Sequence, residues 1–136
     1  MILLDTNVIS ASMRAEGDAN VTRWMDRQPA STLFLSAVTV DEITFGIEVL
    51  PAGRRKSRLA RIFAEIIGVF SGRVLTFDTD AAIESARIRS QRQQKGLPMS
   101  LADSQIAGIA RSNGFSLATM NLRDFAGIDL TVIEPR

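Results

Sequence analysis

The sequence predicts an α/β protein in three layers, in which helices cover both faces of a central, mostly parallel sheet of about five strands. Short apolar runs typical of buried strands alternate along the chain with longer segments of helical period. Hydrophobic residues make up 46% of the 136 residues, which is enough for a packed core, and neither a repeat nor a long linker interrupts the chain. We therefore expect one domain that spans residues 1–136.

Five apolar runs are the predicted strands. They are short and free of charged residues, and they cover residues 2–4, 33–35, 74–77, 116–119 and 130–133. The first run stops at Asp5, Thr6 and Asn7, which favour turns and helix caps. The carboxyl ends of parallel strands meet at one edge of a sheet, where α/β proteins bind their ligands. Asp5 is therefore a candidate site residue, although a plain helix cap explains it equally well.

The segments between these runs have the apolar period of helices. Residues typical of N-caps precede four of them, namely Asn20, Thr39, Asp78 and Ser100. The segment after Asp78 carries Ile83, Ala86 and Ile88. A long basic helix after residue 53 carries one apolar stripe, formed by Leu59, Ile62, Phe63, Ile66 and Ile67.

The composition limits the possible chemistry. The chain has no cysteine and no histidine, which excludes disulfides, thiolate zinc sites and Ser-His or Cys-His nucleophile pairs. Catalysis must rest on carboxylates, hydroxyls, amides, arginines or the two lysines, Lys56 and Lys95. A site made of oxygen ligands alone suits Mg²⁺ or Mn²⁺. No basic leader or membrane span is visible, so we expect a cytoplasmic protein with no membrane contact.

Two acids lie where a helix would normally bury apolar residues. Thr39 and Glu42 fit a capping box, which explains Glu42 as a purely local feature. Helical spacing, however, places Glu42 on a largely apolar face, together with Phe45, Gly46 and Val49. Asp103 follows Ser100 in the same way and shares a face with Ile106, Ala107 and Ala110. An acid on an inward face is costly unless it is paired or bound to a metal.

A fourth group of polar residues follows the last long strand run. Asn121 and Asp124 would lie at the same sheet edge as Asp5, unless they form only a surface turn. If these acids converge, two carboxylates about 4 Å apart repel by about 4 kcal/mol at an effective dielectric constant of about 20. A divalent cation reverses the sign of that interaction, so convergence predicts an octahedral, oxygen-only site suited to Mg²⁺.

Taken in order along nearly the whole chain, these segments resemble the four signatures of the PIN domain, most closely those of VapC-type toxins of bacterial toxin–antitoxin pairs in their FitB-like branch. The segments are Asp5 to Asn7, Ser36 to Glu42 with Gly46, Leu101 to Asp103 with Ile106 and Ala107, and Ala118 to Asn121 with Asp124 and Phe125. The resemblance implies a PIN-like fold and a Mg²⁺-dependent ribonuclease that a cognate antitoxin protein inhibits and that is usually a homodimer. It assigns metal binding to Asp5 and Asp103 and the third acid to Glu42. Many relatives have Asp where Asn121 stands and Arg where Met120 stands.

The expected activity is hydrolysis of RNA phosphodiester bonds. Asp5, Asp103 and, partly through water, Glu42 would hold the metal. Asn7 and Thr119 would orient these ligands, and Asn121 or Asp124 would position a second ion or the attacking water. The alternative function is that of a non-catalytic PIN-like module that binds RNA or protein, and Asn121 is the feature that favours it. A haloacid-dehalogenase-like phosphatase fits poorly, because it would need a second Asp in place of Asn7 and a catalytic lysine.

Two clusters of basic residues have no assigned role. They consist of Arg54, Arg55, Lys56, Arg58 and Arg61, and of Arg87, Arg89, Arg92 and Lys95. Each is most simply a solvated helix face. Otherwise it binds RNA phosphates or receives an acidic segment of the antitoxin.

Overall fold

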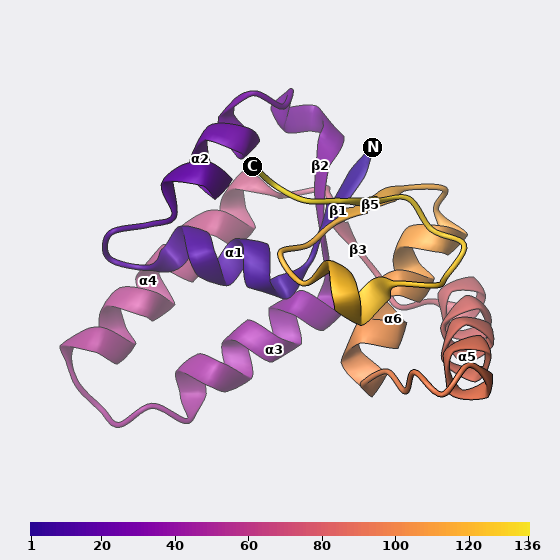
Figure 1. Cartoon of the computed structure of the whole chain (residues 1–136). Helices are drawn as coiled ribbons and strands as arrows, with labels where there is room; N and C mark the ends of the chain where they lie inside the picture. Colours follow the sequence, from indigo (N-terminus) through magenta and orange to yellow (C-terminus); the bar gives the residue numbers. More distant parts are fainter.

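A parallel sheet of five strands forms the centre of the computed structural model, which describes all residues from 1 to 136 (Figure 1). The strand order is β3-β2-β1-β4-β5, with β1 in the middle. The strands are β1 (Ile2–Leu4), β2 (Leu33–Ser36), β3 (Val74–Leu75), β4 (Ser116–Ala118) and β5 (Val132–Ile133). The expected α/β fold with a parallel five-stranded sheet is confirmed. The two outer strands are shorter than predicted, and each of them pairs on one side only.

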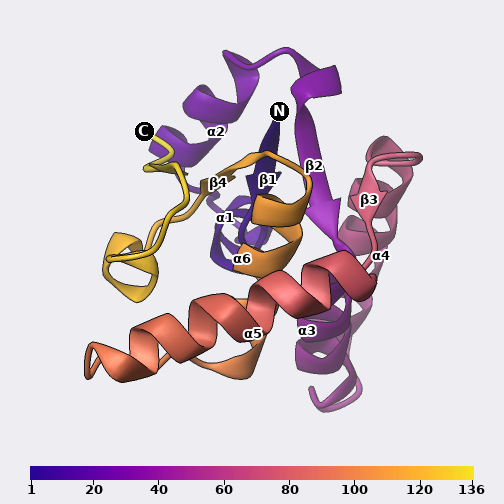
Figure 2. The same ribbon diagram turned by 90° about the vertical axis from the view of Figure 1, so that its right-hand side faces the viewer.

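Six helices and two short 3₁₀ turns connect the strands. The helices are α1 (Thr6–Met13), α2 (Ala19–Asp26), α3 (Ala37–Glu48), α4 (Arg54–Val69), α5 (Thr79–Gln94) and α6 (Leu101–Ser112), and the turns are η1 (Ala30–Thr32) and η2 (Leu122–Phe125). Side chains of α1, α2, α3 and α4 pack with Leu4 and Leu35 on one face of the sheet. Side chains of α5 and α6 pack with Leu3 and Leu117 on the other face (Figure 2). The molecule therefore has the three layers that the sequence predicts.

The central strand sets the position of the candidate site. Leu3 and Leu4 are fully buried, and Leu4 lies opposite Ala118 of β4 in the parallel register. The backbone N–H of Asp5 continues this pairing, since it donates to the Ala118 carbonyl at 2.9 Å. The chain therefore leaves β1 and β4 at the same height, with Asp5 beside Thr119.

Two of the four predicted helix caps are confirmed, and two are wrong. The side chains of Asp78 and Ser100 accept from the N–H groups of Ala81 and Asp103 at 2.9 and 3.1 Å. The cap of α2 is Asp18 rather than Asn20, and its carboxylate accepts from two backbone N–H groups of the first turn. The cap of α3 is Ser36 rather than Thr39.

The earlier start of α3 overturns the predicted capping box. The hydroxyl of Ser36 accepts from the N–H of Thr39 at 3.1 Å, so Thr39 lies inside the first turn and Glu42 follows one turn later. The apolar face of α3 is also reassigned. Its buried residues are Thr39, Ile43 and Ile47, whereas the face that carries Glu42 is open to solvent. The expected burial of Glu42 is wrong, because the helix turns a different side to the core.

At one point, helices α5 and α6 lie so close together that no side chain fits between them. A Cβ atom on Gly108 would lie 2.5 Å from the Ala81 carbonyl oxygen and 2.7 Å from the backbone nitrogen of Ser85. Of the apolar residues expected on α5, Ile88 is buried while Ile83 and Ala86 are exposed. None of the helices has both the length and the apolar character that crossing a membrane requires.

Candidate active site

Asp5 is held at the end of β1 by hydrogen bonds to both of its carboxylate oxygens. Its Oδ1 accepts from the backbone N–H of Thr6 at 2.8 Å, and its Oδ2 accepts from the hydroxyl of Thr119 at 2.8 Å. Asp5 is only 4% exposed and Thr119 is fully buried. Asp5 therefore serves as the cap of α1 and also presents a fixed carboxylate at the sheet edge, so the two interpretations of the sequence do not exclude each other.

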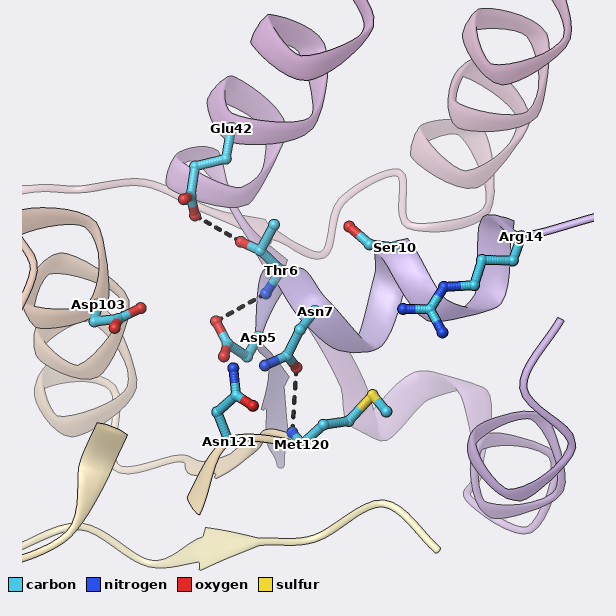
Figure 3. Close-up of a pocket in the computed structure, with 9 residues that line it drawn as sticks. All are labelled: Asp5, Thr6, Asn7, Ser10, Arg14, Glu42, Asp103, Met120 and Asn121. Carbon is cyan, nitrogen blue, oxygen red and sulfur yellow. Dashed lines mark hydrogen bonds between the residues drawn. The ribbon is translucent and has the colours of Figure 1, made fainter. Parts of the chain in front are cut away.

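Asn7 joins helix α1 to the loop that follows β4. Its amide nitrogen donates to the Thr119 hydroxyl at 3.2 Å. Its carbonyl oxygen accepts from the N–H of Met120 at 3.2 Å (Figure 3). The Thr119 oxygen also accepts from the N–H of Asn121 at 3.1 Å. A hydroxyl has one proton and two lone pairs, so the bonding capacity of Thr119 is fully used. Asn7 and Thr119 thus lie where they can fix Asp5 and Asn121 relative to each other.

Glu42 reaches the site from α3 and is held by a chain of hydroxyl groups. The Thr6 hydroxyl donates to Glu42 Oε1 at 2.7 Å, and the oxygens of Thr6 and Thr39 lie 2.9 Å apart. Because Thr6 has a single hydroxyl proton, Thr39 must be the donor in that second bond. Ser36 in turn donates to Thr39 at 3.3 Å. Sequence reasoning missed the role of Thr6, since only the packing of α1 on α3 creates this contact.

Asp103 enters from the first turn of α6 and is half-buried. Burial raises the pKa of its carboxyl group above the usual value, and the nearby charges of Asp124 and Glu42 add to the rise. The hydrogen bond from Ser100 and the charge of Arg92 oppose it. Asp103 therefore lies within electrostatic reach of an acid on α3 and of another in η2.

One cavity of about 440 Å³ collects most of the predicted site residues (Figure 3). Its lining includes Asp5, Glu42, Asp103, Asn7 and Asn121. Asp124 does not line it; this exposed residue of η2 affects the site only through its charge on Asp103. Between the two candidates for the fourth position, the structure therefore places Asn121 at the cavity.

Arg14 is the one basic residue that lines this cavity, and sequence reasoning missed it. Its side chain reaches from the end of α1 toward the site (Figure 3). A signal is present in the sequence: Asn7, Ser10 and Arg14 are polar residues that recur at helical spacing. These three polar residues form the side of α1 that faces the cavity.

The acids of the cavity have no basic partner. None of the ion pairs in the structure includes Asp5, Glu42 or Asp103. Burial raises the pKa of Asp5 to about 6, against the opposing hydrogen bonds from Thr119 and Thr6, and the charges of Asp103 and Glu42 raise it further. The cavity therefore holds an excess of negative charge that Arg14 in its lining and Arg92 near Asp103 offset only in part.

The donor set fits a hard cation. Every side-chain ligand that the acids and amides of the cavity offer is an oxygen, as Mg²⁺ and Mn²⁺ prefer. No three acidic side chains lie close enough together to form a complete ligand cluster. That arrangement is compatible with Mg²⁺, which usually keeps several waters and takes only one or two carboxylates from the protein.

Three of the four residues in the second predicted basic cluster, which begins at Arg87 and ends at Lys95, are engaged in contacts within the protein. Arg92 is 5% exposed and donates to the carbonyl oxygens of Leu97 and Ala126 at 2.7 and 2.6 Å. Lys95 donates to the Gly127 carbonyl at 2.6 Å, and Arg87 pairs with Glu84. The interpretations of this cluster as a solvated face or as an RNA contact are therefore wrong for Arg92, because the segment after η2 folds over it.

Comparisons with known proteins agree with this architecture. The PIN domain family model matches residues 2–129. The chain is 41% identical over 136 residues to the VapC ribonuclease Y4jK of Sinorhizobium fredii, covering 99% of this chain and 97% of that protein. It is 37% identical to toxin FitB of Neisseria gonorrhoeae, covering 99% and 98%.

A solved structure shows the same fold. The crystal structure of FitAcB from Neisseria gonorrhoeae superposes with a TM-score of 0.91 at 37% identity, covering 99% of this chain and 98% of that one. The family match, the high identity to VapC and FitB proteins and the shared fold extend over nearly the whole chain. The chain therefore belongs to the PIN-domain family.

Proposed function

We propose that this protein is a Mg²⁺-dependent endoribonuclease that hydrolyses RNA phosphodiester bonds and acts as the toxin of a type II toxin–antitoxin pair. The observation that carries the proposal is the cavity that carboxylates from the end of β1, from α3 and from α6 line without forming an ion pair. The relatives named ribonuclease and toxin support the same activity. A site of this kind is unfavourable for a protein that only binds RNA.

Asp5, Asp103 and, partly through water, Glu42 are the residues that would hold the metal. Once bound, Mg²⁺ supplies a water of lowered pKa and neutralises charge on the phosphate, and Mn²⁺ can replace it. The chain's own contribution is to hold the carboxylates in place. Thr119 and the N–H of Thr6 fix the oxygens of Asp5, and the Thr6 hydroxyl fixes Glu42.

The remaining polar residues would act on the substrate and the water. The Asn121 amide lies at the cavity, where it can position the attacking water without adding negative charge. Asp124 would act from outside the cavity, through its effect on Asp103. Arg14 is placed to meet the negative charge of the phosphate.

A cognate antitoxin is the proposed protein partner, and RNA is the proposed substrate. The similarity to toxin FitB and to the FitAcB crystal structure supports such a partner. An inhibitor that covers the acidic cavity would block metal and substrate together. The homodimer implied by the family resemblance is part of the same proposal.

Cleavage of a mixed RNA pool by the purified protein tests the activity. We expect cleavage with Mg²⁺ or Mn²⁺, none with a chelator, and at least a roughly hundredfold lower rate for Asp103→Asn, because that change removes a ligand charge. Metal-independent RNA binding without cleavage by the folded, antitoxin-free protein would instead favour the non-catalytic module. Asn121, which supplies an amide where a carboxylate would add charge, is the feature that keeps this alternative open.

A further inference from the structure

A second cavity opens directly beside the acidic one. It has a volume of about 430 Å³ and lies between α1, α3 and α4. The two cavities share four lining residues: Thr6, Ser10, Arg14 and Glu42. They are therefore two halves of one groove, and a ligand centred on the carboxylates extends naturally into the second half.

The charge of the groove reverses from one half to the other. The first cavity is lined by three acids and Arg14, whereas the second is lined by Arg14, Arg55 and Arg58 with Glu42 as its only acid. None of these three arginines forms an ion pair in the structure. Unpaired guanidinium groups beside an acidic site are suited to phosphate, which they contact through two parallel hydrogen bonds.

The second cavity also has an apolar floor. Met13 and Ile43 are buried, Leu59 is partly buried, and all three line it. Gly46 forms part of the wall, and a Cβ atom added there would meet no atom within 4 Å. The missing side chain leaves room for a flat group above apolar residues, as a nucleobase or ribose requires.

We propose that the second cavity binds the nucleotide next to the scissile phosphate of the RNA. Arg14, Arg55 and Arg58 contact its phosphate, and the floor formed by Met13, Ile43 and Leu59 receives its base or sugar. This assignment rests on the proposed ribonuclease function. It adds the direction in which the RNA strand leaves the carboxylates, along α1 toward the start of α4.

Binding of a short fluorescent single-stranded oligoribonucleotide tests the proposal. Anisotropy is measured in an Asp103→Asn background, so that the RNA stays intact. We expect the Arg55→Gln/Arg58→Gln double variant to bind at least about tenfold more weakly, and the slope of log K against log salt to fall by about 0.7 for each phosphate that the variant no longer binds. Arg27→Gln is the matched control, because Arg27 is exposed and lines neither cavity. It should change neither quantity.

A steric variant tests the same site without changing its charge. Gly46→Leu fills the cavity from its wall. Gly68→Leu adds the same side chain to an exposed glycine of α4 that lines neither cavity and whose Cβ atom would meet nothing within 4 Å. We expect Gly46→Leu in the active protein to raise KM about tenfold with kcat nearly unchanged, since the change removes binding rather than chemistry. Gly68→Leu is the matched control and should stay close to the unaltered protein, and thermal melting of each variant verifies that it is folded.

Unchanged RNA affinity and salt slope in the folded double variant, with an unchanged KM for Gly46→Leu, would overturn the nucleotide site while leaving metal-dependent cleavage intact. If the folded double variant binds RNA normally but no longer binds an inhibitor protein, the groove belongs to a protein partner, and the nucleotide site is also overturned. If the unaltered chain neither binds nor cleaves RNA in the presence of Mg²⁺, the proposed function itself fails. These outcomes differ, so the two proposals can be judged separately.

Discussion

Acidic residues form ion pairs on the α5–α6 side of the molecule, whereas those of the cavity form none. On α5, Glu84 accepts from Arg111 at 2.6 Å and from Arg87 at 3.1 Å, and the hydrogen bond from Arg111 is the main reason that the pKa of Glu84 is lowered. At the cavity, Asp5 has only neutral donors, and burial raises its pKa to about 6. Charges on the α5–α6 side stabilise the fold, whereas those at the cavity are held ionised at a cost.

This contrast indicates where the protein depends on something from outside. A buried carboxylate is unfavourable unless a cation compensates for its charge. The cavity is thus adapted to bind rather than to fold. The substitutions below are chosen to test that distinction, in order of decreasing expected effect.

Removing the buried cation of α5 should cause the largest loss of stability. Arg92→Met deletes the donors to Leu97 and Ala126 and leaves their carbonyl oxygens without a partner. We expect the free energy of unfolding to fall by about 3 kcal/mol, because two hydrogen bonds from a buried charged group are lost, and each such bond is worth about 1.5 to 3 kcal/mol. Urea unfolding measures the change, with exposed Arg89→Met on the same helix as the control. Equal values for the two variants would show that Arg92 has no structural role.

Neutralising the central acid should have the opposite sign. In the metal-free protein, Asp5→Asn should raise the free energy of unfolding near pH 7 by about 1 to 3 kcal/mol, since a pKa shift of about two units corresponds to about 3 kcal/mol and the amide makes poorer hydrogen bonds. The folded state holds its Asp5 proton up to about pH 6 and the unfolded state only to about pH 4. The native protein therefore loses stability as pH rises through that interval. Unfolding experiments at pH 4 and pH 7 should show the gain only at pH 7; a destabilised variant at both values would contradict the account.

Breaking the hydroxyl chain should affect metal binding more than folding. Thr6→Val keeps the shape of the side chain but removes the donor to Glu42. We expect about tenfold weaker Mn²⁺ binding by calorimetry, the usual scale for residues that orient metal ligands, and recovery of affinity in Thr6→Ser. If Thr6→Val binds Mn²⁺ as tightly as the unaltered chain, Glu42 does not need Thr6 to reach the metal.

The smallest effect is expected at the ion pair of α5. Glu84→Gln should lower stability near pH 7 by no more than about 1 kcal/mol, because the pair is partly exposed and screened by solvent. Since the pKa of Glu84 is lowered in the folded state, its contribution is present above the ordinary value of 4.5 and disappears as the pH falls below it. Thermal melting at pH 7 and pH 3 measures this. A loss that persists at pH 3 would indicate lost packing rather than lost charge.

The sequence predicts the sheet well because its strands are buried runs between clear turn residues. It predicts helix starts less well. Asp18 and Asn20, or Ser36 and Thr39, are equally suitable caps, and only the path of the chain after the preceding segment decides between them.

The candidate site shows the same limit. Asp5 and the pair Asn121 and Asp124 follow from their positions at the sheet edge, and Asp103 follows from its place on an inward helix face. The structure places Asp5, Asp103 and Asn121 at the cavity. Glu42 reaches it from the solvent side of α3 rather than from the predicted inward face. Contacts between distant segments, such as Thr6 with Glu42, leave no periodic signal in the sequence. Their discovery therefore requires the structure.

The central claim is that the acids of the cavity are compensated by a divalent cation. The most direct measurement is thermal melting of the unaltered protein and of Asp5→Asn near pH 7, with and without Mn²⁺. We predict that Mn²⁺ raises the melting temperature of the unaltered protein and not that of Asp5→Asn, so that the variant's advantage in the metal-free state shrinks or reverses. An equal rise in both proteins, or no rise in either, would contradict the claim.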